Sequence, residues 1–297
     1  MTLDCRAFLP SHPLLLALIL GSPAEQVLTT TPDRGLRSDG IAMVGEELVY
    51  EVRWTLFNLG IIRVHTISAR ESEAFIDSFD NLPFVNLHAV HYTLMDSNYC
   101  ARLSRSIART DGEWEGLICT PDSLNRRVIV ENIKVKDPST APFHRTVQDT
   151  IPLQSPSYID GLSILYFAQS LIHTNRVVSI PTILSGKLST TTFEYNMTRT
   201  KQSIDACDYP VRVIEVKGVT TGEGVFGMSG DFVGWFTDDV AAVPVRGKLK
   251  VARWKRDGGA DPLEAGQLDS PEIKMPSPDW KKAFTDTLCA RRRYSTD

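Results

Sequence analysis

The sequence predicts a mainly β protein, built as a single antiparallel sheet that is curved or rolled into a flattened, half-open barrel and packed on one central helix. Three observations predict this fold. Apolar and polar side chains alternate with a period of two over residues 47–55. Further segments rich in Val, Ile, Thr and aromatic residues follow, joined by short connections, which favours antiparallel neighbours. One apolar segment, 160–171, has helical spacing instead.

Residues 1–24 are predicted to be a secretory signal peptide. The apolar run Leu14–Leu20 is too short to span ~30 Å of hydrocarbon, and Ser22 and Ala24 are small residues suited to a cleavage site. A buried N-terminal helix or an uncleaved anchor is the alternative. Export predicts a periplasmic or secreted protein, with no transmembrane span in the mature chain. Residues 25–40 lack periodicity and are expected to form a linker.

The first strand is predicted over Glu47–Thr55, where Leu48, Tyr50, Val52 and Trp54 share one face. A turn is expected at Phe57–Gly60, followed by a return strand at Ile61–Ser68. The other predicted strands are Phe84–Met95, Arg102–Ala108, Glu113–Cys119, Arg127–Val135, Val177–Leu184, Lys187–Thr198, Val211–Lys217, Gly230–Thr237 and Val243–Trp254.

The central helix is predicted at 160–171, with the Asp160 carboxylate placed to accept hydrogen bonds from N–H groups of the first turn. Its apolar residues lie nearly all round, so it should be buried against the sheet. Residues 41–256 are therefore assigned to one β domain. Residues 257–297 are assigned to a loop, a peripheral helix at Asp279–Arg291 and a basic tail.

The charge balance excludes one class of function. The chain has 32 basic and 36 acidic residues, a net charge of −4, whereas a general nucleic-acid binder needs a basic face. The hydrophobic content of 42% is that of an ordinary globular protein, which excludes a disordered chain.

Four cysteines remain after residue 24: Cys100, Cys119, Cys207 and Cys289. In an exported protein this even number permits two disulfides. Cys100 and Cys119 are the candidate pair, because strands on either side of a turn at residues 110–112 would bring them together. Four buried thiols are the alternative. Because the chain has no CxxC pair, no metal site is expected, and no cofactor is predicted.

Three stretches resemble the bacterial domain-of-unknown-function family 3108. They are Gly45–Trp54, the Asp-x-x-Ser-x-x-Tyr segment that begins at Asp160, and the aromatic strand 234–239 that leads to Val243–Val245. They occur in the order of that family and together cover about residues 41–254. The resemblance implies an exported envelope protein, and it carries over no catalytic residue because the family has none assigned.

Two motifs are candidate sites of binding or catalysis. Residues 222–227 spell GxGxxG, but a glycine-rich, strand-like segment follows where a dinucleotide site needs a helix, so a turn is expected. Asp238 and Asp239 are weak catalytic candidates for a hydrolase, because adjacent carboxylates raise one another's pKa in a pocket. A turn that uses aspartate to bond nearby N–H groups is the favoured interpretation.

The aromatic residues suggest a function. Candidate ligand-facing side chains on the predicted sheet are Tyr50, Trp54, Phe193, Tyr195, Trp235 and Trp254. A curved sheet lined in this way can hold a lipid or another apolar molecule, while an ordinary packed core is the simpler alternative. The sequence therefore favours a non-catalytic envelope protein that binds an apolar ligand. The alternative is a scaffold with a filled core that engages an envelope protein partner.

Overall fold

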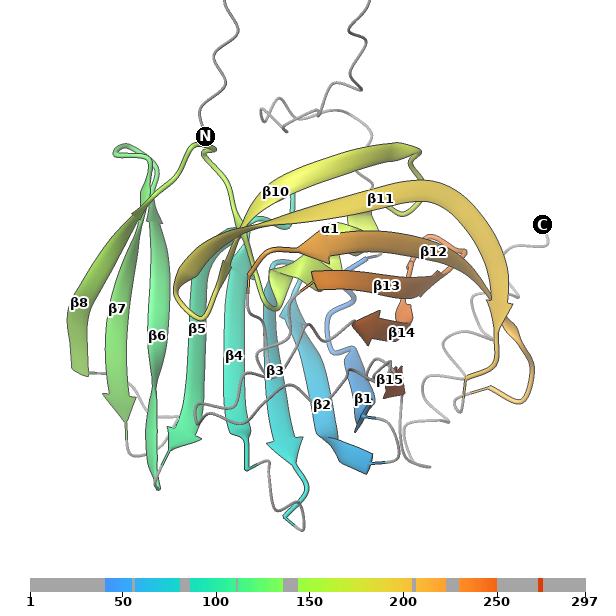
Figure 1. Cartoon of the computed structure of the whole chain (residues 1–297), viewed down its shortest axis with the longest axis horizontal. Helices are drawn as coiled ribbons and strands as arrows, with labels where there is room; N and C mark the ends of the chain where they lie inside the picture. Colours follow the sequence, from blue (N-terminus) through green and yellow to red (C-terminus); the bar gives the residue numbers. More distant parts are fainter. Residues whose placement is uncertain are drawn as a thin grey trace, which may run out of the picture.

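A computed structural model of the chain describes residues 41–54, 57–80, 86–110, 112–135, 144–204, 207–222, 230–249 and 272–274. These residues form one sheet of fifteen strands and the nine-residue helix α1 (Figure 1). The elements are β1 Glu47–Trp54, β2 Phe57–Ser68, β3 Glu71–Ser78, β4 His88–Met95, β5 Ala101–Thr110, β6 Glu113–Asp122, β7 Arg127–Val135, β8 His144–Pro152, β9 Ile159–Asp160, α1 Ser163–Leu171, β10 Arg176–Leu184, β11 Lys187–Gln202, β12 Val211–Thr220, β13 Gly230–Thr237, β14 Pro244–Leu249 and β15 Glu272–Lys274.

The sheet follows the order of the chain in two runs. Strands β8 to β1 lie side by side, β15 comes next, and β14 to β9 complete the order. Every neighbouring pair is antiparallel except β9 and β10, which are parallel and are joined through α1. A helical crossover is the usual connection between parallel strands, whereas hairpins join antiparallel ones. The predicted mainly β, antiparallel, curled sheet is thereby confirmed.

The sheet curls into a half-barrel because its longest strand bends. The register of β11 against β12 shifts between Tyr195 and Thr198, and Met197 has a φ of +54° at this bulge. An extra residue on one strand increases local twist and bends that strand. Figure 1 shows β11 arching over the top of the molecule, so that β10 to β14 form a second wall facing β1 to β8.

The β9–β10 end of the sheet is tucked against the inner face of the other end. Ile183 of β10 and Tyr158, which precedes β9, pack with Cys119, Val128 and Val130 of β6 and β7. The Ser185–Gly186 turn between β10 and β11 reaches the same face, since a Cβ on Gly186 would lie 2.7 Å from Leu117 Cδ1. Both faces of β10 are consequently buried over most of its length.

Helix α1 lies within the curl, where Figure 1 shows it behind β12 and β13. Phe167, Leu171 and other apolar residues of the helix belong to one buried cluster with Phe193, Val216 and Phe236 of β11, β12 and β13. Tyr166 reaches the opposite wall and hydrogen-bonds side chains of β2 and β3. The helix therefore touches both walls of the curl.

Several predicted elements are corrected. The turn expected at Phe57–Gly60 lies inside β2, where Arg53 pairs with Asn58 across a register shift. Strands β3, β8 and β9 were not predicted, and β15 lies in the segment predicted as a loop. The helix predicted over 160–171 begins at Ser163, because Asp160 belongs to β9. The predicted signal peptide 1–24, the linker 25–40 and the C-terminal helix 279–291 lie outside the described residues, as do 223–229 of the glycine motif.

Candidate functional site

The N-terminus of α1 is fastened to the sheet by Asp160. Its Oδ1 accepts the N–H groups of Leu162 and Ser163, both at 2.7 Å, as the sequence predicted. The hydroxyl of Ser163 accepts the N–H of Asp160 in return, at 2.8 Å. The second carboxylate oxygen accepts the Thr93 hydroxyl of β4 at 2.6 Å. Burial raises the pKa of the Asp160 carboxyl, and these hydrogen bonds act against that rise.

Tyr166 fastens the next turn of the helix. Its hydroxyl donates to Ser72 Oγ of β3 at 2.8 Å and lies 2.9 Å from Thr66 Oγ1 of β2. Ser72 in turn donates to the carbonyl of His65 at 3.0 Å. Thr66, Ser72 and Thr93 are cross-strand neighbours on one face of β2, β3 and β4, so they form a row that we call the anchoring row. Each of its hydroxyls has a partner.

A second row lies two residues from Thr93 on β4 and extends to β5. There, His91 of β4 is the direct cross-strand partner of Ser106 of β5, on the same inner face as Thr93 and Ser104. We call His91 and Ser106 the cavity row. Among the described residues neither side chain has a hydrogen-bond partner. The polar groups of the anchoring row are therefore hydrogen-bonded within the protein, whereas those of the cavity row are not bonded to any described residue.

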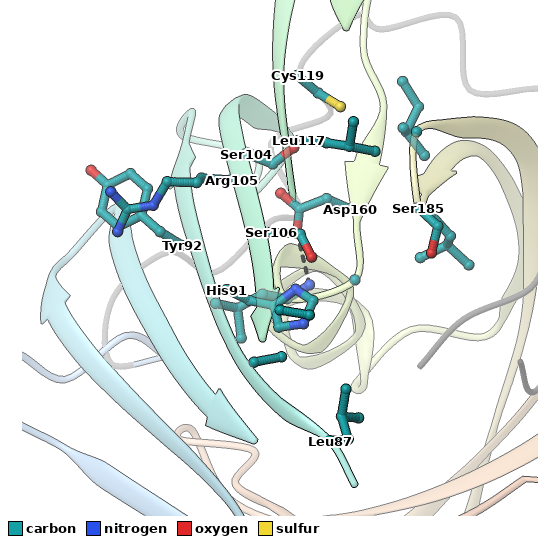
Figure 2. A pocket seen from close by; sticks show the side chains of 17 residues that line it. Leu87, His91, Tyr92, Ser104, Arg105, Ser106, Leu117, Cys119, Asp160 and Ser185 are labelled. Carbon is teal, nitrogen blue, oxygen red and sulfur yellow. Dashed lines mark hydrogen bonds between the residues drawn. The ribbon is translucent and has the colours of Figure 1, made fainter. Parts of the chain in front are cut away.

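The cavity row faces a hollow of about 330 Å³, here called the polar cavity. Figure 2 shows His91, Ser104, Ser106 and Asp160 directed into it, whereas Tyr92 and Arg105 stand together on the outer side. The guanidinium of Arg105 lies 5.5 Å from the Tyr92 ring centroid and 3.6 Å from Glu73. The turn at Ser185 and Gly186 closes the opposite side of the cavity.

Burial sets the protonation state of His91. The imidazole is surrounded by protein, and the part of it that is exposed faces the cavities. This desolvation lowers the pKa of His91 to about 4. At neutral pH the ring is therefore uncharged, with one nitrogen that donates a hydrogen bond and one that accepts.

A second hollow of about 320 Å³, the apolar cavity, lies between α1 and both walls of the sheet. It shares His91, Gly161, Leu162 and Leu184 with the polar cavity, so the two adjoin. Its lining is almost wholly hydrocarbon. The apolar lining residues are Tyr50, Val52, Ile62, Val64, Ala74, Ile76, Leu162, Ile164, Leu165, Ala168, Leu184, Phe193, Val216, Phe232, Val233, Phe236, Pro244 and Leu249.

The four predicted ligand-facing aromatics whose side chains are described fall into three groups. Tyr50 and Phe193 line the apolar cavity. Tyr195 is 2% exposed and stacks on Phe193 within the core, with ring centroids 5.9 Å apart. Trp235 donates its ring N–H to Glu215 at 3.1 Å and has the ammonium of Lys248 6.0 Å from its ring. The side chain of Trp54 and all of Trp254 lie outside the described residues.

Asp238 and Asp239 sit in the turn after β13. Asp239 Oδ1 accepts the Thr237 hydroxyl and the N–H groups of Ala241 and Ala242 at 2.9–3.0 Å. Asp238 pairs with Arg199 at 3.1 Å. These contacts are those of a turn held by aspartate, the interpretation that the sequence favoured.

Cys100 and Cys119 are free, buried thiols, whereas Cys207 is half-buried and Cys289 lies outside the described residues, so the alternative of four buried thiols holds for two of them. The strand register explains why a bridge does not form. Cys119 pairs with Ser104, and Cys100 lies four residues earlier, about 13 Å of extended chain away. A disulfide needs Cα atoms within about 7 Å. Burial raises the pKa of Cys100 to about 12 and that of Cys119 to about 11.

Within the described residues, no cluster of three or more His, Cys, Asp or Glu side chains is arranged to bind a metal ion. No helix in this part of the chain has the length and hydropathy needed to cross a bilayer.

Sequence reasoning missed the cavity row and two aromatic cavity residues, Phe232 and Phe236. His91 carries no local motif, and its only signal is parity within β4, which places it on the face opposite His88. Identifying Ser106 as its partner requires the register of β4 against β5. No hydropathy pattern supplies that register, because both positions are polar.

No protein-family model matches this chain, and no curated protein matches it. Among solved structures, it is similar to the crystal structure of a β-barrel-like protein of domain of unknown function DUF1849 from Brucella abortus. The identity is 8% and the TM-score 0.49, over 78% of this chain and 95% of that chain. That neighbour belongs to a bacterial domain of unknown function other than family 3108. A likeness this distant carries no argument about function.

Proposed function

We propose that this protein is a non-catalytic module of the bacterial cell envelope that binds an apolar molecule, such as a lipid chain, inside its curled sheet. The observation that carries the proposal is the apolar cavity of about 320 Å³ between α1 and the two walls of the sheet. Ligand sites are typically hollows of this size, lined by hydrocarbon with a few polar groups. The proposed envelope location rests on the predicted signal peptide at 1–24.

The cavity favours this function over the scaffold with a filled core. Protein interiors are packed as densely as organic crystals, and voids larger than a water molecule are few. Here apolar side chains of β2, β3, β13 and α1 line a hollow of about 320 Å³ that is partly open to solvent. A protein whose sole task was to present its outer surface would have no need of that space.

The hydrolase alternative finds no support at Asp238 or Asp239. Three donors occupy one oxygen of Asp239, and Asp238 is paired with Arg199. Neither residue lines the polar or the apolar cavity.

Native mass spectrometry of the protein purified from its own cells, followed by solvent extraction, tests the proposal. A bound apolar molecule that is released on extraction is the expected result. Ala74, which is 4% exposed and lines the apolar cavity, offers a variant that fills the space, Ala74→Phe. Val177→Phe, at a position 54% exposed on β10, is the matched control.

The filled variant should carry no ligand, while the control should carry as much as the unaltered protein. An unliganded mass for the unaltered protein, together with no uptake of a fluorescent fatty acyl probe, would contradict the proposed function.

A further inference from the structure

We propose that the ligand is amphipathic, with an uncharged hydroxyl-bearing head that hydrogen-bonds His91 and Ser106 while its hydrocarbon chain fills the apolar cavity. This inference rests on the proposed function and names the chemistry of its ligand.

His91 and Ser106 are close enough for one small group to bond both. His91 and Ser106 are direct cross-strand partners on adjacent antiparallel strands. Such partners have Cβ atoms about 4.5–5.5 Å apart, so one small group can bond both. Neither has a hydrogen-bond partner among the described residues, although both line the polar cavity. Both side chains are half-buried, so their polar atoms are reachable from the cavity and free to bond a group that enters it.

The two cavities meet at His91, where the lining changes from apolar to polar. His91, Gly161, Leu162 and Leu184 belong to the walls of both cavities. A chain lying between α1 and the sheet therefore ends beside the imidazole, where the lining changes from hydrocarbon to hydroxyl groups. Figure 2 shows the two polar side chains pointing into the space in which that end would lie.

Charge selects the head group. The Asp160 carboxylate lines the polar cavity, so a carboxylate or phosphate head would be buried beside a like charge. The guanidinium of Arg105 is engaged on the outer side with Tyr92 and Glu73, and it brings no compensating charge inward. Arg246 and Lys248 line the apolar cavity but not the polar cavity, so they do not lie beside Asp160. Both oxygens of Asp160 already accept hydrogen bonds, which disfavours a cationic head as well. A hydroxyl can donate to the accepting nitrogen of neutral His91 and accept from Ser106.

Four ligands with ten-carbon chains that differ only in the head group test this proposal. On the full chain, 1-decanol, 1-chlorodecane, decanoate and decylamine compete at pH 7.5 with a fluorescent apolar probe. Decanol should bind about tenfold more tightly than chlorodecane, which is the equivalent of one net hydrogen bond. It should also bind more tightly than decanoate and decylamine, because each of these must bury a charge.

Two variants locate the head group. His91→Phe and Ser106→Ala should each reduce decanol binding several-fold and leave chlorodecane binding unchanged. His88→Phe, on the opposite face of β4, should alter neither affinity. Ser106→Ala removes few atoms, so it provides the test if the larger change at His91 prevents folding.

The outcomes separate this inference from the function on which it rests. Equal binding of decanol and chlorodecane, or tighter binding of decanoate or decylamine, would overturn the uncharged head and leave the apolar site intact. Unchanged decanol binding by Ser106→Ala would remove Ser106 from the site. Failure of all four chains to displace the probe would overturn the proposed function itself.

Discussion

The anchoring row and the cavity row adjoin on β4, yet their polar groups have different partners. Thr66, Ser72 and Thr93 are buried, and all three are bonded to Tyr166 or Asp160. His91, two residues from Thr93 on β4, and Ser106, its cross-strand neighbour on β5, have no partner among the described residues and face a cavity. The contrast separates polar groups that hold the helix from polar groups available to a ligand.

The strongest test of the anchoring row is Asp160→Ala. It leaves the Thr93 hydroxyl and the N–H groups of Leu162 and Ser163 without their acceptor. The free energy of unfolding should fall by about 3 kcal/mol or more, because buried unpaired donors cost about 1–3 kcal/mol each. Urea denaturation measures the change.

The control for that variant is Asp149→Ala on exposed β8, where the carboxylate accepts the N–H of the adjacent Thr150. It should cost less than about 0.5 kcal/mol, as surface changes usually do. Similar losses in the two variants would show that Asp160 does not anchor α1.

Acid should act on the cavity row through His91. Its folded pKa of about 4 lies below the ordinary value of 6.5, so between these pH values the unfolded chain binds a proton that the folded protein does not. The free energy of unfolding should therefore decrease as the pH falls, and at pH 4 the histidine should lower it by about 3 kcal/mol relative to neutral pH. Asp160, in the same cavity, acts in the opposite direction because burial raises its pKa.

Comparison of the unaltered protein with His91→Phe isolates the histidine contribution, because Asp160 is common to both. The variant should lose less stability than the unaltered protein between pH 7 and pH 4. Parallel stability curves for the two proteins would mean that His91 is not held neutral by burial.

Tyr166→Phe sharpens the comparison at the second anchor. The change removes one hydroxyl that bonds both Thr66 and Ser72, so unfolding should become easier by about 1–2 kcal/mol. Tyr92→Phe, on the outer face beside Arg105, is the matched control and should be nearly neutral. An equal effect of the two changes in thermal or urea unfolding would count against the anchoring row.

The smallest effect gives the most direct contrast between the rows. Ser72→Ala removes a hydroxyl with two hydrogen bonds and should cost about 1 kcal/mol. Ser106→Ala removes a hydroxyl that has no hydrogen bond to the described part of the chain, and it should leave the free energy of unfolding within about 0.5 kcal/mol of the starting value. Equal costs in urea denaturation would erase the distinction between anchoring and cavity rows.

Strands could be predicted where apolar residues mark the inner face, and β3 is one of the strands missed because they do not mark it there. In β3 the inward positions include Ser72, Ala74 and Ser78, which are buried but carry little hydrophobic signal. The cap at Asp160 was predicted because its donors lie two and three residues away. Its bond to Thr93 spans 67 residues, and only tertiary structure reveals it.

The candidate site was predictable in outline alone. An aromatic inner face pointed to an apolar site, and Tyr50 and Phe193 do line the apolar cavity. Trp235 bonds Glu215 instead, because parity along a strand does not say which face of a rolled sheet another segment covers. His91 and Ser106 could not be paired from sequence, since register depends on contacts between strands.

The central proposal is that His91 faces a ligand site. The most direct test is the NMR spectrum of the histidine rings during a titration with 1-decanol. We predict saturable shifts of the His91 ring, with no shift of the His88 ring, whose Nδ1 lies 3.1 Å from Asp77 on the other face of β4. Saturable binding of decanol that leaves the His91 resonances in place would contradict the account.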